Sequence, residues 1–481
     1  MSVYIQRNTS FTESEKLVNE LGVKSFLRFW TWPNLFRDQE NGKEICDLII
    51  VFGNDILLIS DKKIEFNKDK DINVEWKRWY KKAIAKSFSQ TKGAERWIRE
   101  FPTRLFVDKE CTNRFPINFD ITQAKFHHIL VTHGLETILE EQLGYASLQF
   151  TNDGELGDQH PFRIGLINRN DPFVHVFTEK TLLDSLGLFD TANDFLEYLK
   201  LRESFFLNEK DVSLNAEGDL ITLWYESYAE STEERNIFSN LEMKKYSINL
   251  NYPTFDKFIK REDFNLKKEL DRNSYFWDAL IESFSYHILN GTSIDNNNWT
   301  EIHEIEEKIR NMAQANRFQR RILGDSFVSM YYDFKNKRGT RLSTISGLEQ
   351  AYLFFCLPVE VEYGSMEQYR EVRKMMLHEY AVIRKLRHPE IKSLVMIGFA
   401  SARDGSILDT SFFEEGNDFG YIDFSDWSEE DNNQAKYVLA EYEKHNLVGK
   451  NQITEMTAEE FTPTYKKTRP KTNADQLRQN S

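Results

Sequence analysis

The chain has 481 residues, a formal net charge of −15 at pH 7, 14% aromatic residues and only three cysteines. This length exceeds one ordinary hydrophobic core, so we expect two or three domains, and the widely spaced cysteines indicate neither a disulfide framework nor a zinc cluster. The longest apolar runs are strand-sized and the first residues lack a signal-peptide core, so we expect a cytoplasmic protein that does not enter a membrane.

The first predicted element is a helix from about Glu13 to Leu21. Thr12 is a suitable N-cap, and Glu15 stands three residues later, where it completes a capping box. Glu13 and Glu20 flank the apolar face of this helix. Either of them is a candidate third carboxylate for a neighbouring site, although a solvated surface role is the simpler interpretation.

Two apolar strands follow, over residues 44–52 and 56–63, and they carry one aspartate each, Asp47 and Asp61. Asp47 lies inside a continuous apolar run, where an ionised side chain is expensive to bury without a partner. We therefore expect this carboxylate to have a partner, and a metal ion is one candidate.

The relative position of the two aspartates depends on the turn between the strands. If residues 53–55 form a three-residue turn, Asp47 lies directly opposite Asp61, with the side chains roughly 5 Å apart on one face. Alternation along the second strand then places Lys63 on the same face. Two carboxylates and an amine in this arrangement can hold Mg²⁺ and position a water. We favour this register because all three groups share a face.

A second register is open. If the turn is a two-residue Asn54-Asp55 loop, the pairing slips by one residue, Asp47 faces Lys62, and Asp61 points to the other side of the sheet. Lys62 would then be the catalytic lysine. This register leaves a buried ion pair with no metal requirement, unless Glu44 or a helix acid contributes.

A basic segment follows the second strand. Residues 61–110 contain 14 Lys and Arg against 9 Asp and Glu, a net charge of +5, whereas the rest of the chain carries −20. Residues 74–99 predict a helix, with Gly93 as a candidate break. Beside a metal site, a helix with this many cations and aromatic residues is typical of a surface that binds a phosphate backbone; the alternative is a solvated amphipathic helix whose aromatic residues face the core. The cations expected to bind nucleic acid are Lys77, Arg78, Lys81, Lys82 and Lys86.

These residues resemble the signature of the PD-(D/E)XK superfamily, the restriction-endonuclease-like nucleases. Asp47 matches the first acid, and Asp61-Lys62-Lys63 matches the second acid and the lysine, on consecutive strands behind one helix and before another. Cys46 stands where the signature has proline. The resemblance covers roughly residues 10–132.

The resemblance implies that Asp47 and Asp61, helped by the carbonyl of Lys62, bind one or two Mg²⁺ (or Mn²⁺) ions, which stabilise charge on the phosphorus and activate a water. Lys63 would orient that water or neutralise the transition state, and the basic helix would hold DNA. Gln90, on the later part of that helix, is an auxiliary candidate for the site, and so are Glu13 and Glu44.

Other motifs are weaker. His127, His128 and His133 could suggest a metal site, but the adjacent pair points to opposite faces of a strand. The sequence contains no Walker-type loop, dinucleotide fingerprint or nucleophile elbow, which argues against an ATPase, a dehydrogenase and a serine hydrolase.

The expected fold class is α/β. We expect a nuclease-like, restriction-endonuclease-like α/β domain over residues 1–205, a mainly helical region over 206–335, an α/β region over 336–463 and a polar tail over 464–481. The first boundary is placed from an amphipathic helix pattern that ends near Phe205.

We expect a magnesium-dependent endodeoxyribonuclease, regulated by its acidic C-terminal part and, by analogy alone, acting in bacterial anti-phage defence. That C-terminal part would bind a protein partner or self-associate. The alternative is a noncatalytic protein- or nucleic-acid-binding protein with a degenerate nuclease core. RNA is not excluded as the target, because basic helices that contact the backbone do not read the sugar.

Overall fold

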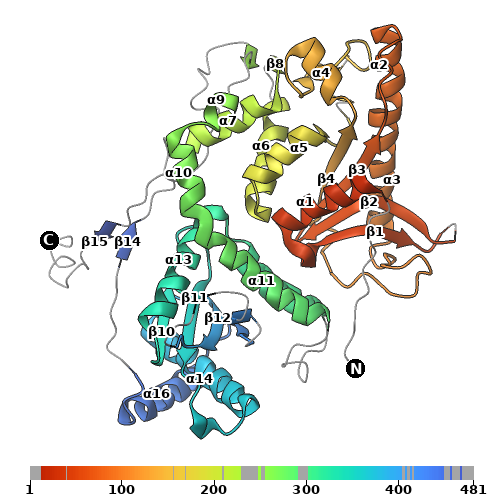
Figure 1. Cartoon of the computed structure of the whole chain (residues 1–481). Coiled ribbons are helices and arrows are strands. Elements are labelled where there is room, and N and C mark those ends of the chain that lie inside the picture. Colours follow the sequence, from red (N-terminus) through yellow and green to blue (C-terminus); the bar gives the residue numbers. More distant parts are fainter. Residues whose placement is uncertain are drawn as a thin grey trace, which may run out of the picture. The chain divides into compact units, whose positions relative to one another are not determined.

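The chain has an α/β fold with mixed sheets, and the computed structural model divides it into two compact units (Figure 1). The first unit comprises Met1–Arg261 and Ser285–Asn316, and the second comprises Glu262–Phe284 and Arg317–Ser481. Within the described residues, no helix is long and apolar enough to cross a membrane. The described residues are 12–39, 41–154, 156–167, 170–207, 211–228, 247–250, 255–290, 302–403, 407–408, 412–413, 416–448, 455–457 and 466–468.

A five-stranded sheet forms the core of the first unit. Its strand order is β1-β2-β3-β4-β7; β1, β2 and β3 are antiparallel neighbours, and β4 and β7 run parallel to β3. The central strands are almost entirely buried, which explains their continuous apolar runs. The strands are β1 (Thr31–Arg37), β2 (Lys43–Phe52), β3 (Asp55–Lys63), β4 (Lys125–His133) and β7 (Val174–Thr178).

The predicted first helix is confirmed as α1 (Glu13–Trp30), although it is longer than expected and kinked at Leu27, whose φ is +62°. The Thr12 hydroxyl accepts the N–H of Glu15, and the Glu15 carboxylate accepts the N–H of Thr12, so the capping box is present. The helix packs against β1, β2 and β3. A Cβ on Gly22 would lie 3.2 Å from Leu48 Cδ2, so the helix approaches β2 closely there.

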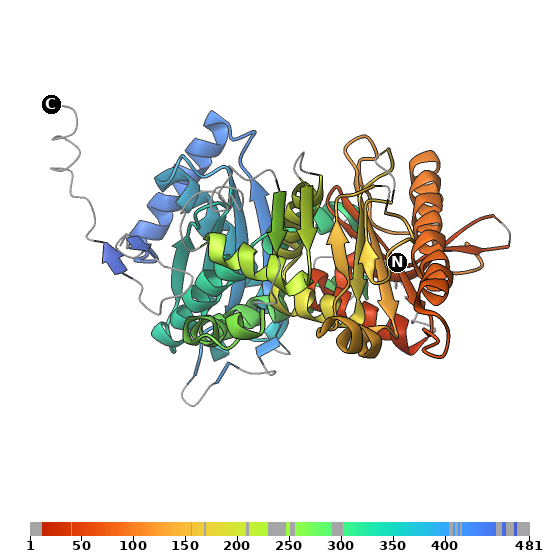
Figure 2. The ribbon, with the colours of Figure 1, turned by 90° about the horizontal axis from the view of Figure 1, so that it is seen from above.

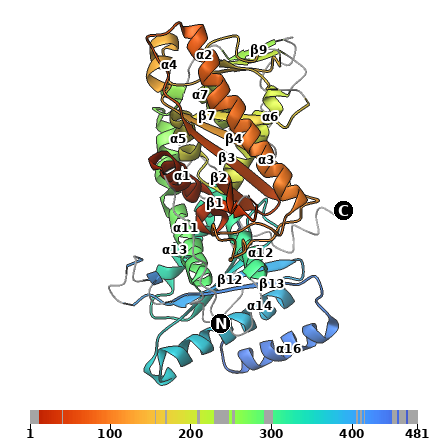
Figure 3. The ribbon, with the colours of Figure 1, turned by 90° about the vertical axis from the view of Figure 1, so that its right-hand side faces the viewer.

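The basic segment forms one long helix, which lies across the sheet in Figure 3. It comprises α2 (Ile72–Tyr80), a π-helical segment η1 (Lys81–Ala85) and α3 (Lys86–Glu100). The expected break near Gly93 is absent, because α3 continues through it; the irregularity lies at η1. Helix α3 packs against β2, β3 and β4 and so reaches the strands that carry the two aspartates.

The first unit extends beyond the boundary expected at residue 205. Strand β8 pairs with β5, and Trp30 Nε1 donates a hydrogen bond to Glu306 Oε1 over 2.6 Å, so a segment 276 residues away packs on α1. The expected helical region 206–335 is therefore divided between the two units. The additional elements are α4 (Glu136–Leu143), β5 (Gln149–Thr151), β6 (Arg163–Ile164), α5 (Glu179–Leu188), α6 (Ala192–Phe206), β8 (Asp211–Leu214), α7 (Glu217–Tyr228), β9 (Ser247–Leu250), α9 (Phe255–Phe258) and α12 (Ile302–Ala313).

The second unit contains a four-stranded sheet of order β10-β11-β12-β13, shown in teal to blue in Figure 2. Strands β11 and β12 are parallel, as expected for strands joined through a helix, and α14 packs against them and against α16. Of the expected polar tail, only β15 lies within the described residues. The elements are α10 (Glu262–Leu270), η2 (Asp271–Asn273), α11 (Ser274–Leu289), α13 (Arg317–Asp333), β10 (Gly339–Ser343), β11 (Ala351–Leu357), η3 (Val361–Tyr363), α14 (Met366–Arg387), β12 (Ser393–Ala400), β13 (Asp418–Asp423), α16 (Glu429–Lys444), β14 (Glu455–Thr457) and β15 (Lys466–Thr468).

Candidate functional site

The β2–β3 hairpin turns through two residues, Gly53 and Asn54, so both turns expected from the sequence are wrong. Phe52 pairs with Asp55, and Gly53 has φ = +61°, a conformation that glycine adopts without steric cost. Asp55 belongs to β3 and not to the turn, because its Oδ1 lies 2.8 Å from Nε2 of His127 on β4. This long-range contact accounts for the difference from the predicted register.

The observed register brings polar groups from β3 and α3 onto the carboxylate of Asp47, which is only 7% exposed. Asp47 Oδ2 accepts the backbone N–H of Asp61 over 2.6 Å and lies 3.1 Å from Nζ of Lys62. The Ser60 hydroxyl donates to the same oxygen over 3.3 Å, and Gln90 Nε2 donates to Oδ1 over 3.3 Å. The buried acid therefore has charge and hydrogen-bond partners from two neighbouring elements.

The strands part where this cluster forms. Regular pairing between β2 and β3 ends at Leu48 and Ile59. Beyond that point the Cys46 thiol donates to the Ile59 carbonyl oxygen over 2.9 Å, and the Asp47 carboxylate replaces a backbone acceptor for the N–H of Asp61. Side chains from β3 and α3, those of Ser60 and Gln90, contact Asp47 at this point.

Glu44 is the second acid of the site. Burial raises its pKa to about 7, the negative charges of Asp47 and Glu15 add to that shift, and Lys62 opposes it. Its buried Oε1 has no hydrogen-bond partner among the described residues. Glu15 is the helix acid that acts on Glu44, whereas the auxiliary candidate Glu13 is exposed.

The side chain of Asp61 does not join Asp47, so the expectation that the two carboxylates share one face is wrong. Asp61 Oδ1 lies 2.5 Å from Nε2 of His133, whose Nδ1 lies 2.7 Å from Oε2 of Glu179 at the start of α5. Burial lowers the pKa of His133, but the hydrogen bonds and charges of the two carboxylates outweigh burial and raise it. Asp61 therefore contributes its backbone N–H to Asp47 and its carboxylate to a separate histidine cluster.

The two lysines, Lys62 and Lys63, also lie in different surroundings. Lys62 reaches Asp47 with a side chain that is 27% exposed, whereas Lys63, the catalytic lysine in the favoured register, is exposed and lines a surface hollow. Among the described residues, no group of three or more His, Cys, Asp or Glu side chains is assembled as a metal cluster. The site is thus a pair of nearby acids with a lysine.

The basic helix separates its charges from its aromatic rings. Trp76, Trp79 and Tyr80 are buried, as the amphipathic alternative expects, while four of the five cations are exposed: Lys77, Lys81, Lys82 and Lys86. Arg78 instead binds the buried Glu75, whose hydrogen bond and charge raise the pKa of the guanidinium. Arg78 is therefore engaged within the protein, and the other four cations are available to a ligand.

The three histidines of β4 hydrogen-bond to separate groups. His127 contacts Asp55, and His128 contacts Glu95 and Thr91 on α3. The two adjacent rings thus face different neighbours, as expected from strand alternation. Sequence reasoning missed the role of Ser60; alternation with Lys62 was the signal for it, because residues two apart share a strand face.

No family model, curated protein or solved structure matches this chain. What the site can do must therefore be argued from its own groups. A buried carboxylate with a lysine, an amide and a second acid of raised pKa can bind a divalent cation and hold a water molecule.

Proposed function

We propose that this chain is a Mg²⁺- or Mn²⁺-dependent nuclease that cleaves phosphodiester bonds of DNA, with Asp47, Glu44 and Lys62 at its centre. The observation that carries the proposal is the convergence of Lys62 Nζ and Gln90 Nε2 on the buried carboxylate of Asp47. Glu44 lies close enough to repel that carboxylate. The consecutive strands β2 and β3 follow helix α1 and precede the long α2–α3 helix, which is the arrangement that the PD-(D/E)XK resemblance implies.

The residues present fit a divalent cation. The buried Oε1 of Glu44 has no hydrogen-bond partner among the described residues. Burial, and after it the negative charges of Asp47 and Glu15, raise the pKa of Glu44, and a bound cation would favour its ionised form. Glu44 and Asp47 would hold the ion. Glu15 is a third acid, whose negative charge acts on Glu44. When bound, Mg²⁺ supplies stabilisation of negative charge on the phosphoryl oxygens and a lower pKa for a bound water.

Lys62 and Gln90 have separate roles in this proposal. The partly exposed ammonium of Lys62 orients the attacking water or neutralises charge that develops on the phosphate. Gln90 accepts from the Ser60 hydroxyl and donates to Asp47, so it fixes the direction of the carboxylate. Asp61 positions Asp47 through its backbone N–H.

A second candidate function is a noncatalytic binding protein with a degenerate nuclease core. The specific observation in its favour is the 3.1 Å ion pair between Lys62 and Asp47, which satisfies both charges without a metal. The unpartnered Oε1 and raised pKa of Glu44 favour the metal-dependent alternative, since a purely structural ion pair does not require a second acid beside it.

In our proposal, the acidic remainder of the chain restrains the nuclease activity. It does so by binding a protein partner or by self-association, and the biological setting is host defence. The motivation is the charge division, +5 over residues 61–110 and −20 elsewhere. Negative charge of this size repels DNA until a trigger rearranges the chain. Full cleavage of plain DNA by the intact chain without an activator would contradict this part of the proposal.

Plasmid cleavage tests the catalytic proposal. The intact chain is incubated with supercoiled DNA in Mg²⁺, Mn²⁺ or EDTA, together with Asp47→Asn and Lys62→Met, after circular dichroism has shown that each is folded. Glu13→Gln is the control, since Glu13 is an exposed acid near the start of α1. Because the acidic remainder restrains the intact chain, we expect partial cleavage, which requires metal and is lost in both site variants. Cleavage that survives both substitutions would overturn the assignment of Asp47 and Lys62, and no cleavage by the wild-type chain with metal would favour the noncatalytic alternative.

A further inference from the structure

A surface hollow of about 620 Å³ lies where β3 ends. Five cations and one acid contribute to its lining, together with apolar and amide groups. The hollow begins at Lys63, the residue directly after Lys62 on β3, and its lining residue Lys82 belongs to the long helix whose later part carries Gln90, which contacts Asp47. Its charged lining residues are Lys63, Glu65, Lys68, Lys70, Arg78 and Lys82.

Two of the five cations are already paired. Lys68 Nζ lies 2.6 Å from Oε1 of Glu141, and Arg78 binds Glu75. The remaining three, Lys63, Lys70 and Lys82, have no ion-pair partner within the part of the chain that the structure describes, and all three are exposed. The hollow therefore holds three available ammonium groups against the single carboxylate of Glu65.

The wall of the hollow is tied to α2. Arg78 Nη2 donates to the Glu65 carbonyl oxygen over 2.5 Å, and the N–H of Asn67 donates to Glu75 Oε1 over 3.0 Å. Trp79 Nε1 also donates to the Ile64 carbonyl oxygen over 3.2 Å. These contacts hold the segment after β3 against the helix, so the lysines project from a fixed backbone.

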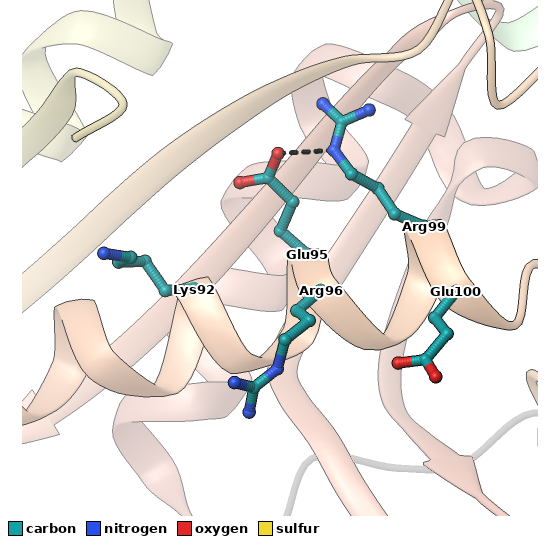
Figure 4. Close-up of a pocket in the computed structure, with 5 residues that line it drawn as sticks. All are labelled: Lys92, Glu95, Arg96, Arg99 and Glu100. Carbon is teal, nitrogen blue, oxygen red and sulfur yellow. Dashed lines mark hydrogen bonds and ion pairs between the residues drawn. The ribbon is translucent and has the colours of Figure 1, made fainter. Parts of the chain in front are cut away.

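A second hollow, of about 470 Å³ along α3, lacks this charge excess (Figure 4). Glu95 Oε1 lies 2.7 Å from Nε of Arg99, and Lys92 binds Asp171. Its remaining charged residues, Arg96 and Glu100, have opposite signs. The second hollow thus has three cations against two acids, and two of those cations are paired, whereas the first hollow has five cations against one acid.

We propose that the hollow at Lys63, Lys70 and Lys82 binds consecutive backbone phosphates of a DNA strand beside the phosphate that is cleaved. The inference rests on the proposed nuclease function and adds a subsite to it. Three ammonium groups suit an extended polyanion, and contacts to phosphates alone position a strand without reading its sequence. The side chains of Lys62 and Lys63 then serve the reacting phosphate and its neighbours respectively.

The test is a binding measurement that needs no cleavage. The intact chain in EDTA is titrated into a fluorescein-labelled 20-base-pair DNA duplex at several salt concentrations, and anisotropy is recorded. The variant is Lys63→Gln, Lys70→Gln and Lys82→Gln together. The control carries Arg96→Gln, Lys109→Gln and Lys200→Gln, three exposed cations outside the hollow, so both triple variants change the net charge equally.

Each phosphate contact contributes about 0.9 to the slope of log affinity against log salt concentration. We therefore expect the slope of the hollow variant to fall by about 2 to 3, and that of the control to stay near the wild-type value. An equal loss in both triple variants, or no loss in either, would overturn the hollow assignment, as would a wild-type chain that does not bind DNA. Normal binding with no metal-dependent cleavage would instead overturn the proposed nuclease function and leave the binding surface intact.

Discussion

The backbone N–H of Asp61 lies 2.6 Å from Oδ2 of Asp47, whereas the carboxylate of Asp61 points to His133. The two aspartates are thus in contact through one backbone group and not through a shared cation. This relationship follows from the two-residue turn at Gly53 and Asn54, which brings Ser60 and Lys62 to Asp47. In our proposal, Asp47 and Lys62 therefore have the central roles and Asp61 is a positioning residue.

Lys62 and Lys63 are expected to differ in which kinetic constant they control. Lys62→Met removes the ammonium beside Asp47, so we expect kcat to fall by at least about 100-fold, the usual size of a lost transition-state contact. Lys63→Met removes a phosphate contact in the hollow, so we expect KM to rise with kcat nearly unchanged. Steady-state cleavage of a labelled duplex measures both constants. The opposite division of effects would contradict the roles assigned to the two lysines.

Asp61→Asn is expected to reduce stability more than activity. It keeps the backbone N–H that binds Asp47 but removes the charge beside His133, so we expect the free energy of unfolding to fall by about 1–3 kcal/mol. Urea denaturation gives this value, with the exposed Asp426→Asn as the control. An unchanged unfolding midpoint would show that the histidine cluster contributes nothing.

The loss of stability caused by Asp61→Asn is expected to depend on pH. The pKa of His133 is raised in the folded chain, so its stabilisation is complete below its ordinary value of 6.5 and is lost as pH rises through the raised pKa. The destabilisation by Asp61→Asn should therefore be larger at pH 6 than at pH 9. A loss of equal size at both values would argue that Asp61 acts only through neutral hydrogen bonds.

Glu44 should link metal binding to pH. Its pKa of about 7 means that, without metal, its contribution to stability is complete below pH 4.5 and is lost as pH rises through 7. Mg²⁺ favours the ionised form, so the rise in Tm caused by Mg²⁺ should grow between pH 6 and pH 8. Glu44→Gln should remove this growth, and Glu13→Gln should not. Thermal melts with and without Mg²⁺ check it, and identical shifts in wild type and Glu44→Gln would exclude Glu44 as a ligand.

Two glycines provide opposite tests of the backbone. Gly53 has φ = +61° at the hairpin turn, so Gly53→Ala should cost about 1–2 kcal/mol. Gly93 lies within α3, and a Cβ there meets no atom within 4 Å, so Gly93→Ala should add about 0.5–1 kcal/mol. Denaturant unfolding compares the two. Stabilisation by Gly53→Ala would contradict the turn.

Local signals in the sequence predicted much of the first unit. The capping box at Thr12 is confirmed, and the two strands follow from their apolar runs. The expectation that Asp47 needs a partner is also confirmed, since four groups contact its carboxylate. Each of these features depends on residues within a few positions of one another, or on the cost of burying a charge.

The features that sequence reasoning missed depend on distant residues. The turn was misplaced because Asp55 is held in β3 by His127, 72 residues later. The boundary at 205 was misplaced because Glu306 binds Trp30 across 276 residues. No local pattern marks either contact. The sequence did not decide whether the aromatic rings of the basic helix bind a ligand or face the core. The structure places Trp76 and Trp79 in the core.

The most direct test compares Asp47→Asn with Asp61→Asn in single-turnover cleavage of a labelled DNA duplex, with the intact chain in excess and Mn²⁺ present. Our account predicts that Asp47→Asn slows cleavage at least about 100-fold, whereas Asp61→Asn stays within about tenfold of wild type, because it retains the N–H that Asp47 accepts. Cleavage by Asp47→Asn at the wild-type rate would contradict the proposed centre, and equal losses in the two variants would contradict the roles assigned to the two aspartates.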